Sequence, residues 1–443
     1  LESGLAGADS SPARLTRFAF LWAPGRDRVS PLLGNEGIMK KKIILGALAL
    51  VIVAAGIGFL IYKRELDRLS FASSLFTGAE QYENFGRMAD MFPVATMHAA
   101  ETPFEFADGA PIGLPDSFTY GDQSVDTEAF LAETDTSALL VLKDGKVRFE
   151  RYMLTGGRNV NWMSMSVAKS FVSAAIGIAV EEGHIKSIEE PVTAYAPSLA
   201  GSAYDGVRIK DILQMSSGAR WNEDYGDPDS DINRFGRILA LGGSLNAFAA
   251  TLEGEREPGT YNHYNSTDTQ VLGLLLTKAT GRSVTDYMEE KLWKPLGAES
   301  DAYWLIDDEG MEMVFGGLNA TARDYAKLGE LYRLGGVWQG KQLVPAEWVR
   351  ASTTPDAPHL MPGNNPASAF PLGYGYQWWI IESTEREFSA IGVYNQFIYV
   401  NPARDLVIVK LSANSDYATS DDPSAFRELE TIEFFREIGN RLN

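Results

Sequence analysis

The feature that most constrains this chain is a run of twenty residues without a charge, IILGALALVIVAAGIGFLIY, at positions 43–62. At 1.5 Å per residue, a helix of that length spans about 30 Å, the thickness of the hydrocarbon core of a bilayer. No other stretch of the sequence is comparable. We therefore expect one transmembrane anchor over 43–62, with the membrane as a partner and a folded part after it.

The charges beside this run give an orientation. Three lysines stand at 40–42 and several arginines lie further upstream, whereas basic and acidic residues are mixed over 63–68. By the positive-inside rule we expect residues 1–42 to be a cytoplasmic extension and the folded part to be periplasmic or extracellular. A cleaved signal peptide is the alternative, but the apolar run is long and no Ala-x-Ala-like site follows it directly.

Residues 1–38 lack sustained periodicity and are rich in Gly, Ser, Arg and Pro. Met39 and the three lysines after it look like the start of an anchor, so one hypothesis is that residues 1–38 are not native. N-terminal sequencing of the native protein tests it.

Composition excludes several classes of protein. Hydrophobic residues make up 45 % and charged residues 22 % of the 443-residue chain, which is an ordinary globular mixture. The net charge of −20 argues against nucleic acid as a partner, because phosphate binding needs a basic surface. The chain has no cysteine, which excludes disulfides, thiolate metal sites and cysteine nucleophiles, and its four histidines leave little for a metal site. We expect no cofactor.

The pattern after the anchor divides into a stalk over 63–115 and a domain over 116–443. Two β-rich runs flank Asp144-Gly145, which predicts a hairpin. Residues 166–182 are apolar on every side and are followed by Gly183, which predicts a buried helix. The middle of the chain, to about residue 335, is expected to be mostly helical.

Strand patterns return near the C-terminus as YQWWIIES, NQFIYVNP and LVIVKLS, before a last helix predicted over 424–438. Strands at both ends and helices between them predict an α+β fold. Its antiparallel sheet would be assembled from both chain ends, flanked by helices, with an inserted, mostly helical subdomain.

The candidate chemistry begins at Ser166-Val167-Ala168-Lys169, an S-x-x-K motif at the start of the buried helix; the sequence has no G-x-S-x-G motif. Lys169 lies one turn after Ser166 on the same helix face. A lysine held against an apolar helix is desolvated, which lowers its pKa and lets it accept the serine proton. The alternative is a surface lysine whose stem lies along the helix, and about one such motif is expected by chance in a chain of this size.

A second candidate is the polar loop PGTYNHYNSTD at 258–268, before an apolar helix. Tyr264 could relay a proton to a leaving group, or it could only bond the loop. We interpret its neighbour His263 as structural.

These motifs, in this order, resemble those of the serine β-lactamase-related hydrolases, which include class C β-lactamases, D,D-peptidases, esterases and 6-aminohexanoate-dimer hydrolases. The resemblance extends from about residue 137 to the C-terminus and is strongest to the 6-aminohexanoate-dimer hydrolase branch, whose second motif is also Tyr-x-Ser. It is carried by Ser166-x-x-Lys169, Tyr264-x-Ser266, Ala390-Ile391-Gly392 and three segments at 212–225, 316–329 and 395–409.

The resemblance implies a β-lactamase/transpeptidase-like fold and a role for each matching residue. Ser166 would be the acylated nucleophile, Lys169 its general base, and Tyr264 the proton relay to the leaving group. Ser266 would hold the Lys169 amine.

It also implies that the backbone N–H of Ser166 and one from the third motif, at Ile391 beside Gly392, form the oxyanion hole. Tyr225 matches a loop tyrosine that closes over the substrate amide in the dimer-hydrolase branch. Ala390 stands where β-lactamases and D,D-peptidases carry Lys or His, and loss of that cation removes the usual partner of a β-lactam carboxylate.

The loop 223–231 is acidic, with carboxylates at 223, 224, 227, 229 and 231. It could recognise a substrate amine or hold Ca²⁺, but it lacks the glycine and glutamate of an EF-hand, and a solvated loop is the simplest interpretation. We predict a serine hydrolase that cleaves small esters or linear amides through an acyl-enzyme. The alternatives are a D,D-peptidase or weak β-lactamase, and a non-catalytic envelope binding protein.

Overall fold

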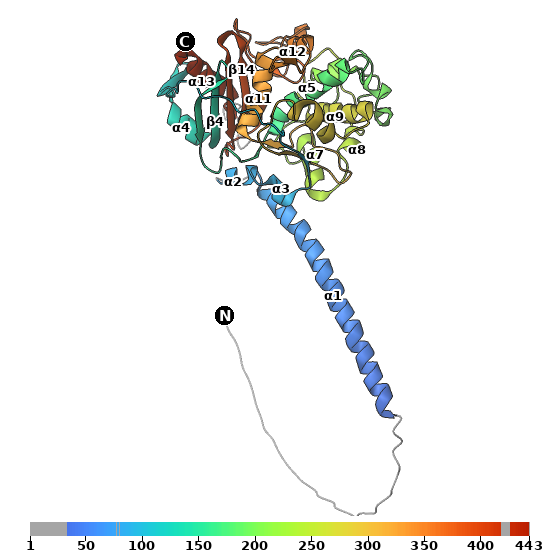
Figure 1. Cartoon of the computed structure of the whole chain (residues 1–443). Helices are drawn as coiled ribbons and strands as arrows, with labels where there is room; N and C mark the ends of the chain where they lie inside the picture. The colour runs from blue at the N-terminus through green and yellow to red at the C-terminus, as the bar shows by residue number, and fades with distance from the viewer. Residues whose placement is uncertain (1–32, 77, 79, 418–425, 443) are drawn as a thin grey trace, which may run out of the picture. The chain divides into compact units, whose positions relative to one another are not determined.

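The computed structural model describes residues 33–76, 78, 80–417 and 426–442, in two compact units that meet between Lys63 and Arg64. The helix α1 (Leu33–Ser74) contains the predicted anchor (Figure 1). Its stretch Gly37–Leu60 is long and apolar enough to cross a membrane, and none of it is buried. A signal sequence would pass the same test, so the membrane anchor remains a prediction.

The larger unit is built on a seven-stranded antiparallel sheet of order β11-β12-β13-β14-β15-β4-β5. The early hairpin lies at one edge, beside the last strand of the chain, so both chain ends form the sheet, as predicted. The strands are β4 (Thr136–Lys143), β5 (Lys146–Tyr152), β11 (Gly373–Tyr374), β12 (Trp379–Ile380), β13 (Phe388–Gly392), β14 (Gln396–Asn401) and β15 (Leu406–Ser412).

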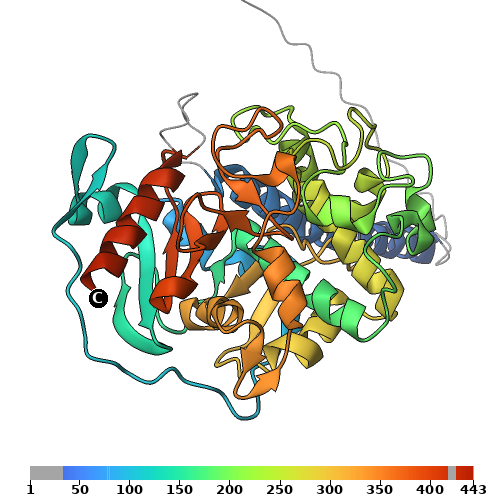
Figure 2. The same cartoon turned by 90° about the horizontal axis from the view of Figure 1, so that it is seen from above.

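Alternation of side chains places apolar residues on both faces of this sheet. Leu139 and Val141 of β4 face one core and Leu140 and Leu142 face the other. The helices α4 (Thr127–Glu133) and α13 (Glu428–Arg441) cover the first face, and α11 (Ala322–Arg333) covers the second (Figures 1 and 2). Both faces are therefore buried, which explains the nearly continuous apolar runs in these strands.

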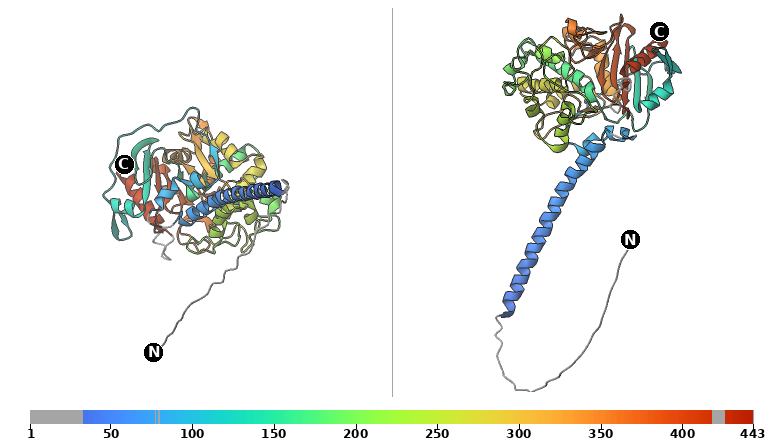
Figure 3. Two further views of the ribbon diagram at one scale, coloured as in Figure 1. Left: turned by 90° about the horizontal axis from the view of Figure 1, so that it is seen from below. Right: turned by 180° about the vertical axis from the view of Figure 1, so that it is seen from behind.

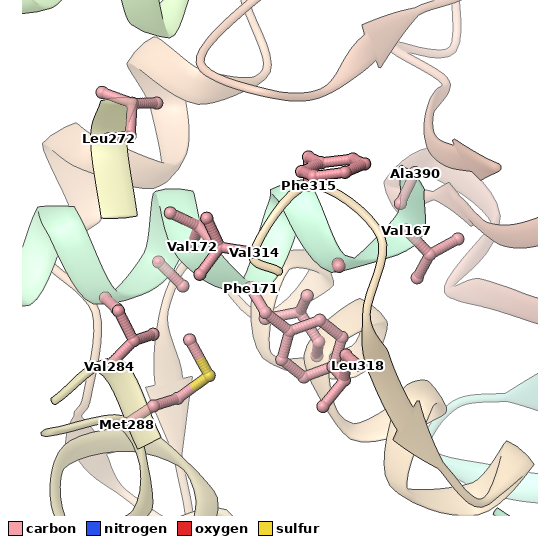
Figure 4. Close-up of a cluster of buried hydrophobic side chains, with 14 of the residues drawn as sticks. Val167, Phe171, Val172, Leu272, Val284, Met288, Val314, Phe315, Leu318 and Ala390 are labelled. Carbon is pink, nitrogen blue, oxygen red and sulfur yellow. The ribbon is translucent and has the colours of Figure 1, made fainter. Parts of the chain in front are cut away.

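The helical part lies beside the sheet in every view (Figure 3). Its centre is α5 (Ala168–Glu181), which is buried along almost its whole length and packs against α9 (Ser266–Thr280). Figure 4 shows side chains from several segments meeting around α5: Phe171 and Val172 of α5 with Val284, Met288, Val314 and Leu318. Around this centre lie α6 (Ile209–Leu213), α7 (Asp231–Leu241), α8 (Leu245–Ala249), α10 (Val284–Met288) and α12 (Ala346–Ser352).

A second, four-stranded sheet was not predicted. Its order is β1-β7-β8-β6, from β1 (Val94–Met97), β6 (Trp162–Met163), β7 (Ala302–Leu305) and β8 (Leu318–Ala320). The strand β1 lies inside the predicted stalk, and Phe85, Met88 and Met97 of this segment are buried in the main core. Apolar side chains at these positions make the segment part of the domain rather than a spacer.

The remaining elements are short. The helices α2 (Tyr82–Phe85) and α3 (Met88–Met91) precede β1, and two small hairpins pair β2 (Ser117–Tyr120) with β3 (Gln123–Asp126) and β9 (Val337–Trp338) with β10 (Lys341–Gln342). The predicted last helix corresponds to α13, which begins at Glu428; the predicted start at 424 lies outside the described residues.

Candidate active site

Ser166 lies in a single 3₁₀ turn, η1 (Met165–Val167), that leads directly into α5. The residue before it, Met165, has φ of 46°, a left-handed conformation that is uncommon for residues other than glycine. Such backbone conformations persist only where packing holds them, and they concentrate at functional sites. Ser166 itself is 7 % exposed and lines a cavity of about 1080 Å³. The serine is thus fixed by the core and open to a small molecule.

The amine of Lys169 is buried one turn after Ser166, as the S-x-x-K spacing predicts. Its Nζ donates to Ser166 Oγ at 2.8 Å, to Ser266 Oγ at 3.2 Å and to the carbonyl of Phe315 at 2.7 Å. None of these partners is a carboxylate. Burial lowers the pKa of Lys169 to about 7, and the Glu223 carboxylate opposes this with a smaller upward effect. Near neutral pH much of the amine is therefore uncharged, and an uncharged amine can take the proton of the serine hydroxyl.

One hydroxyl group, that of Ser266, links the carboxylate of Glu223 to this amine. Ser266 Oγ accepts from Lys169 and donates to Glu223 Oε1 at 2.6 Å, while the Ser266 N–H donates to Oε2 at 3.1 Å. Trp221 Nε1 donates to Oε2, and the Tyr225 hydroxyl donates to Oε1 at 2.9 Å. Four donors thus hold one carboxylate beside the lysine. The interpretation of 223–231 as a solvated loop is wrong for Glu223. Sequence spacing did not single it out because Ser266, which links it to the lysine, lies 43 positions later.

Tyr264 lies over the lysine. Its ring stacks on Trp379 with centroids 5.2 Å apart and meets Tyr374 edge-on, and Lys169 Nζ is 5.0 Å from the ring centroid. Burial raises the pKa of the Tyr264 hydroxyl well above its usual value, while a hydrogen bond with Ser166 acts in the opposite direction. The hydroxyl is therefore protonated at neutral pH and lies next to the serine. Trp379 lines the same cavity as Ser166.

The third motif lies in β13, whose end packs against η1. A Cβ atom on Gly392 would be 2.9 Å from the Ser166 nitrogen and 2.8 Å from the carbonyl of Ser164, so a side chain there would displace the serine backbone. Ile391 lines the same cavity as Ser166. Ala390 is buried. The structure therefore brings all three motifs together around Ser166.

The other predicted residues are also located. Tyr225 lines the cavity, and burial together with the negative charge of Glu223 raises the pKa of its hydroxyl. Asp227 Oδ1 accepts from the backbone N–H of Asp229 at 2.9 Å, within its own loop. The described residues contain no group of three or more His, Asp or Glu suited to a metal ion. His263 Nε2 lies 3.0 Å from the carbonyl of Trp221, consistent with the structural role expected for it.

Comparison with known proteins agrees with this arrangement. The sequence model of the family described as "Beta-lactamase" matches residues 127–431. The 6-aminohexanoate-dimer hydrolase of Paenarthrobacter ureafaciens is 32 % identical over 342 residues, which cover 75 % of this chain and 85 % of that protein.

Solved structures give the same fold. One, described as a 6-aminohexanoate-dimer hydrolase from Bacillus anthracis, is 22 % identical and superimposes with a TM-score of 0.74 over 83 % of this chain and 96 % of that one. The hydrolase EstCE1, with promiscuous acyltransferase activity, gives 0.55 at 14 % identity, over 71 % of this chain and 96 % of its own. The resemblance drawn from the motifs is confirmed, and the chain belongs to the β-lactamase family of serine hydrolases.

Proposed function

We propose that this protein hydrolyses small esters or linear amides through an acyl-enzyme on Ser166. The observation that carries the proposal is the 2.8 Å contact between Lys169 Nζ and Ser166 Oγ, made by a buried amine whose partners among the described residues are two hydroxyls and a carbonyl. A serine hydroxyl is a weak nucleophile until a base takes its proton, and a lysine with a pKa of about 7 is such a base at neutral pH.

In the acylation step, the neutral amine of Lys169 accepts the hydroxyl proton while Ser166 Oγ attacks the substrate carbonyl carbon. The backbone N–H groups of Ser166 and Ile391 stabilise the resulting oxyanion. As the bond to the leaving group breaks, Tyr264 donates its proton to the departing oxygen or nitrogen and regains one from the Lys169 ammonium. The alcohol or amine leaves, and an ester of Ser166 remains.

Deacylation repeats these steps with water as the nucleophile. The Tyr264–Lys169 pair removes a proton from the water molecule, hydroxide adds to the acyl carbonyl, and Ser166 Oγ leaves with a proton. The second product is a carboxylic acid. Ser266, held by Glu223, keeps the amine aligned through both steps, and Tyr225 lies where it can contact an amide in the cavity.

The substrate class is supported by the relatives and by Ala390. The P. ureafaciens relative is named for hydrolysis of a linear amide dimer, and it shares 32 % of its aligned residues with this chain. A buried alanine at 390 supplies no cation for the carboxylate of a β-lactam, which disfavours the β-lactamase and D,D-peptidase alternatives.

The proposal extends to the location of the enzyme. Residues 43–62 would be a single-pass anchor, residues 1–42 cytoplasmic, and the catalytic unit periplasmic or extracellular. The length and apolar character of Gly37–Leu60 support this topology. Protease digestion of intact cells, spheroplasts and permeabilised cells tests this location. A catalytic unit that resists the protease in intact cells and in spheroplasts would lie in the cytoplasm.

Gel labelling with a fluorophosphonate tests the activated serine. The full-length protein in detergent would be labelled beside Ser166→Ala and beside Ser173→Ala, a change at another buried serine of α5. We expect labelling of the wild type and of Ser173→Ala and none of Ser166→Ala. Hydrolysis of p-nitrophenyl acetate should follow the same pattern.

Two other results would contradict the proposal. Retained ester hydrolysis by Ser166→Ala would place the nucleophile elsewhere. A folded wild-type protein that neither labels nor hydrolyses a small ester would favour the non-catalytic binding protein.

A further inference from the structure

A second carboxyl group lines the cavity of Ser166, on the wall formed by the C-terminal helix. Glu428 is the first residue of α13 and lines the cavity with Leu429, the residue after it. The helix covers one face of the sheet (Figure 2), where Ile432, Phe434, Phe435 and Ile438 are buried. The mechanism above gives Glu428 no role.

The contacts of Glu428 leave half of its carboxylate unused. The Tyr417 hydroxyl donates to Oε1 at 2.8 Å. Within the described residues, Oε2 has no hydrogen-bond donor and no Lys or Arg forms an ion pair with the carboxylate. Burial raises the pKa of Glu428 to about 7, and only the Tyr417 hydrogen bond opposes this. Glu428 is half-buried, so its carboxyl group is only partly removed from water, and titratable groups with shifted pKa values cluster at functional sites.

The basic side chain nearest in sequence does not serve as its partner. Arg427 also lines the cavity, but its Nε and Nη2 bond both oxygens of Glu430, at 2.6 and 3.0 Å. Its Nη1 bonds Glu133 at 2.7 Å. Two other carboxylates therefore hold the guanidinium and balance its charge.

The remaining charged groups on the described cavity wall are also acidic. Glu223 is occupied by its four donors, and Asp224 and Asp227 accept backbone N–H groups of their own loop. These carboxylates make the cavity attractive to a cation and repulsive to an anion. Among them, Glu428 combines a fixed helical position with a free oxygen.

We propose that Glu428, held by Tyr417, is a specificity-determining residue that binds the ammonium group of a cationic ester or amide in the Ser166 cavity. The inference rests on the proposed function for its biological meaning. An ammonium group would donate to Oε2 and supply the missing positive charge, and its alkyl stem would lie against apolar side chains of the cavity such as Phe370 and Trp379.

The test compares two small competitors of equal length, hexylammonium and hexanol, as inhibitors of p-nitrophenyl acetate hydrolysis by the full-length protein. In the wild type, hexylammonium should bind more tightly. In Glu428→Gln, which keeps the size of the side chain and an acceptor for Tyr417, the inhibition constant of hexylammonium should rise about tenfold or more, while that of hexanol stays within about twofold. Tyr417→Phe should give a smaller rise.

Glu433→Gln is the matched control. It removes the same charge from the same helix, but Glu433 lies outside this cavity and bonds Arg436 at 2.7 Å. Its inhibition constants should equal those of the wild type. An unchanged hexylammonium constant in Glu428→Gln, or an equal loss in Glu433→Gln, would overturn the proposal.

A calorimetric titration separates this inference from the proposed function. Hexylammonium would be titrated into Ser166→Ala and into Ser166→Ala/Glu428→Gln, neither of which needs to turn over substrate. Weaker binding to the double variant supports the role of Glu428 even if no ester is hydrolysed. Equal binding to both refutes it even if the wild type is an active esterase.

Discussion

The carboxylate of Glu223 should set the pH at which this enzyme becomes active. The mechanism requires a neutral Lys169, so kcat/KM for a neutral ester should rise with pH through the pKa of Lys169, about 7, and then level off. Glu223 favours the charged amine. Its replacement by glutamine should therefore lower that pKa and move the rising limb to lower pH.

The size of this shift in the pKa of Lys169 follows from the Ser266 hydroxyl, which bonds both Lys169 and Glu223. Because Ser266 Oγ lies 3.2 Å from Lys169 Nζ and 2.6 Å from Glu223 Oε1, the two charges are at most about 6 Å apart. At an effective dielectric constant of about 20, their attraction is about 3 kcal/mol, which corresponds to about two pH units. Partial exposure of Glu223 screens part of this, so we expect a shift of about one to two pH units.

The assay is hydrolysis of p-nitrophenyl acetate from about pH 5 to pH 9, followed at the isosbestic wavelength of p-nitrophenol. Glu223→Gln keeps the acceptor for the Ser266 hydroxyl but loses the one for Trp221 Nε1 and the Ser266 N–H, so its plateau should also fall. Asp224→Asn is the control, because Asp224 lies in the same loop and does not affect the pKa of Lys169. An unshifted limb in Glu223→Gln, or an equal shift in Asp224→Asn, would refute the assignment of Lys169 as the base.

Three further outcomes test the site and the core. Tyr264→Phe keeps the ring stacked on Trp379 but loses the hydroxyl that carries the proton, so kcat should fall about a hundredfold or more with little change in KM. An unaltered kcat would remove Tyr264 from the mechanism. Gly392→Ala would put a Cβ 2.9 Å from the Ser166 nitrogen and should lower kcat/KM roughly a hundredfold, with thermal unfolding measured alongside to exclude a general loss of stability. Phe171→Ala empties a fully buried position and should cost about 3–5 kcal/mol in denaturant unfolding; a cost below about 1 kcal/mol would show that the core around α5 collapses to fill the space.

The main sheet was predictable because its signals are local. A turn at Asp144-Gly145 between two apolar runs specifies a hairpin, and the late runs at 396–401 and 406–412 have the length and β-branched content of strands. The buried helix α5 was equally visible, since apolar residues on every side leave no face for solvent. The order of the strands in the sheet was not predicted.

The small sheet and the Glu223 contacts could not be predicted in this way. The four residues of β1 pair with β7, more than two hundred positions later, and nothing in VATM distinguishes a strand from a spacer. Glu223 differs from Asp224 and Asp227 only in what the fold brings to it: Ser266, 43 positions later, and the Lys169 amine behind it. Side chains that meet across such distances leave no local periodicity to read.

Two features of the site bear on the charge of the cavity. Ala390 stands where relatives that act on β-lactams have a cation, and Arg427 is paired with Glu430 and Glu133. Glu223, Asp224 and Asp227 already make the cavity wall acidic, and Glu428 adds a carboxyl group that forms no ion pair with a Lys or Arg of the described residues. An anionic substrate would meet repulsion there, whereas a cationic substrate would pair with the half-buried carboxylate of Glu428. The same groups that exclude a carboxylate therefore select an ammonium. Exchanging Ala390 for lysine should weaken hexylammonium binding while leaving hexanol binding unchanged. Equal weakening of both would mean that the substitution disrupts the structure of the site rather than its charge.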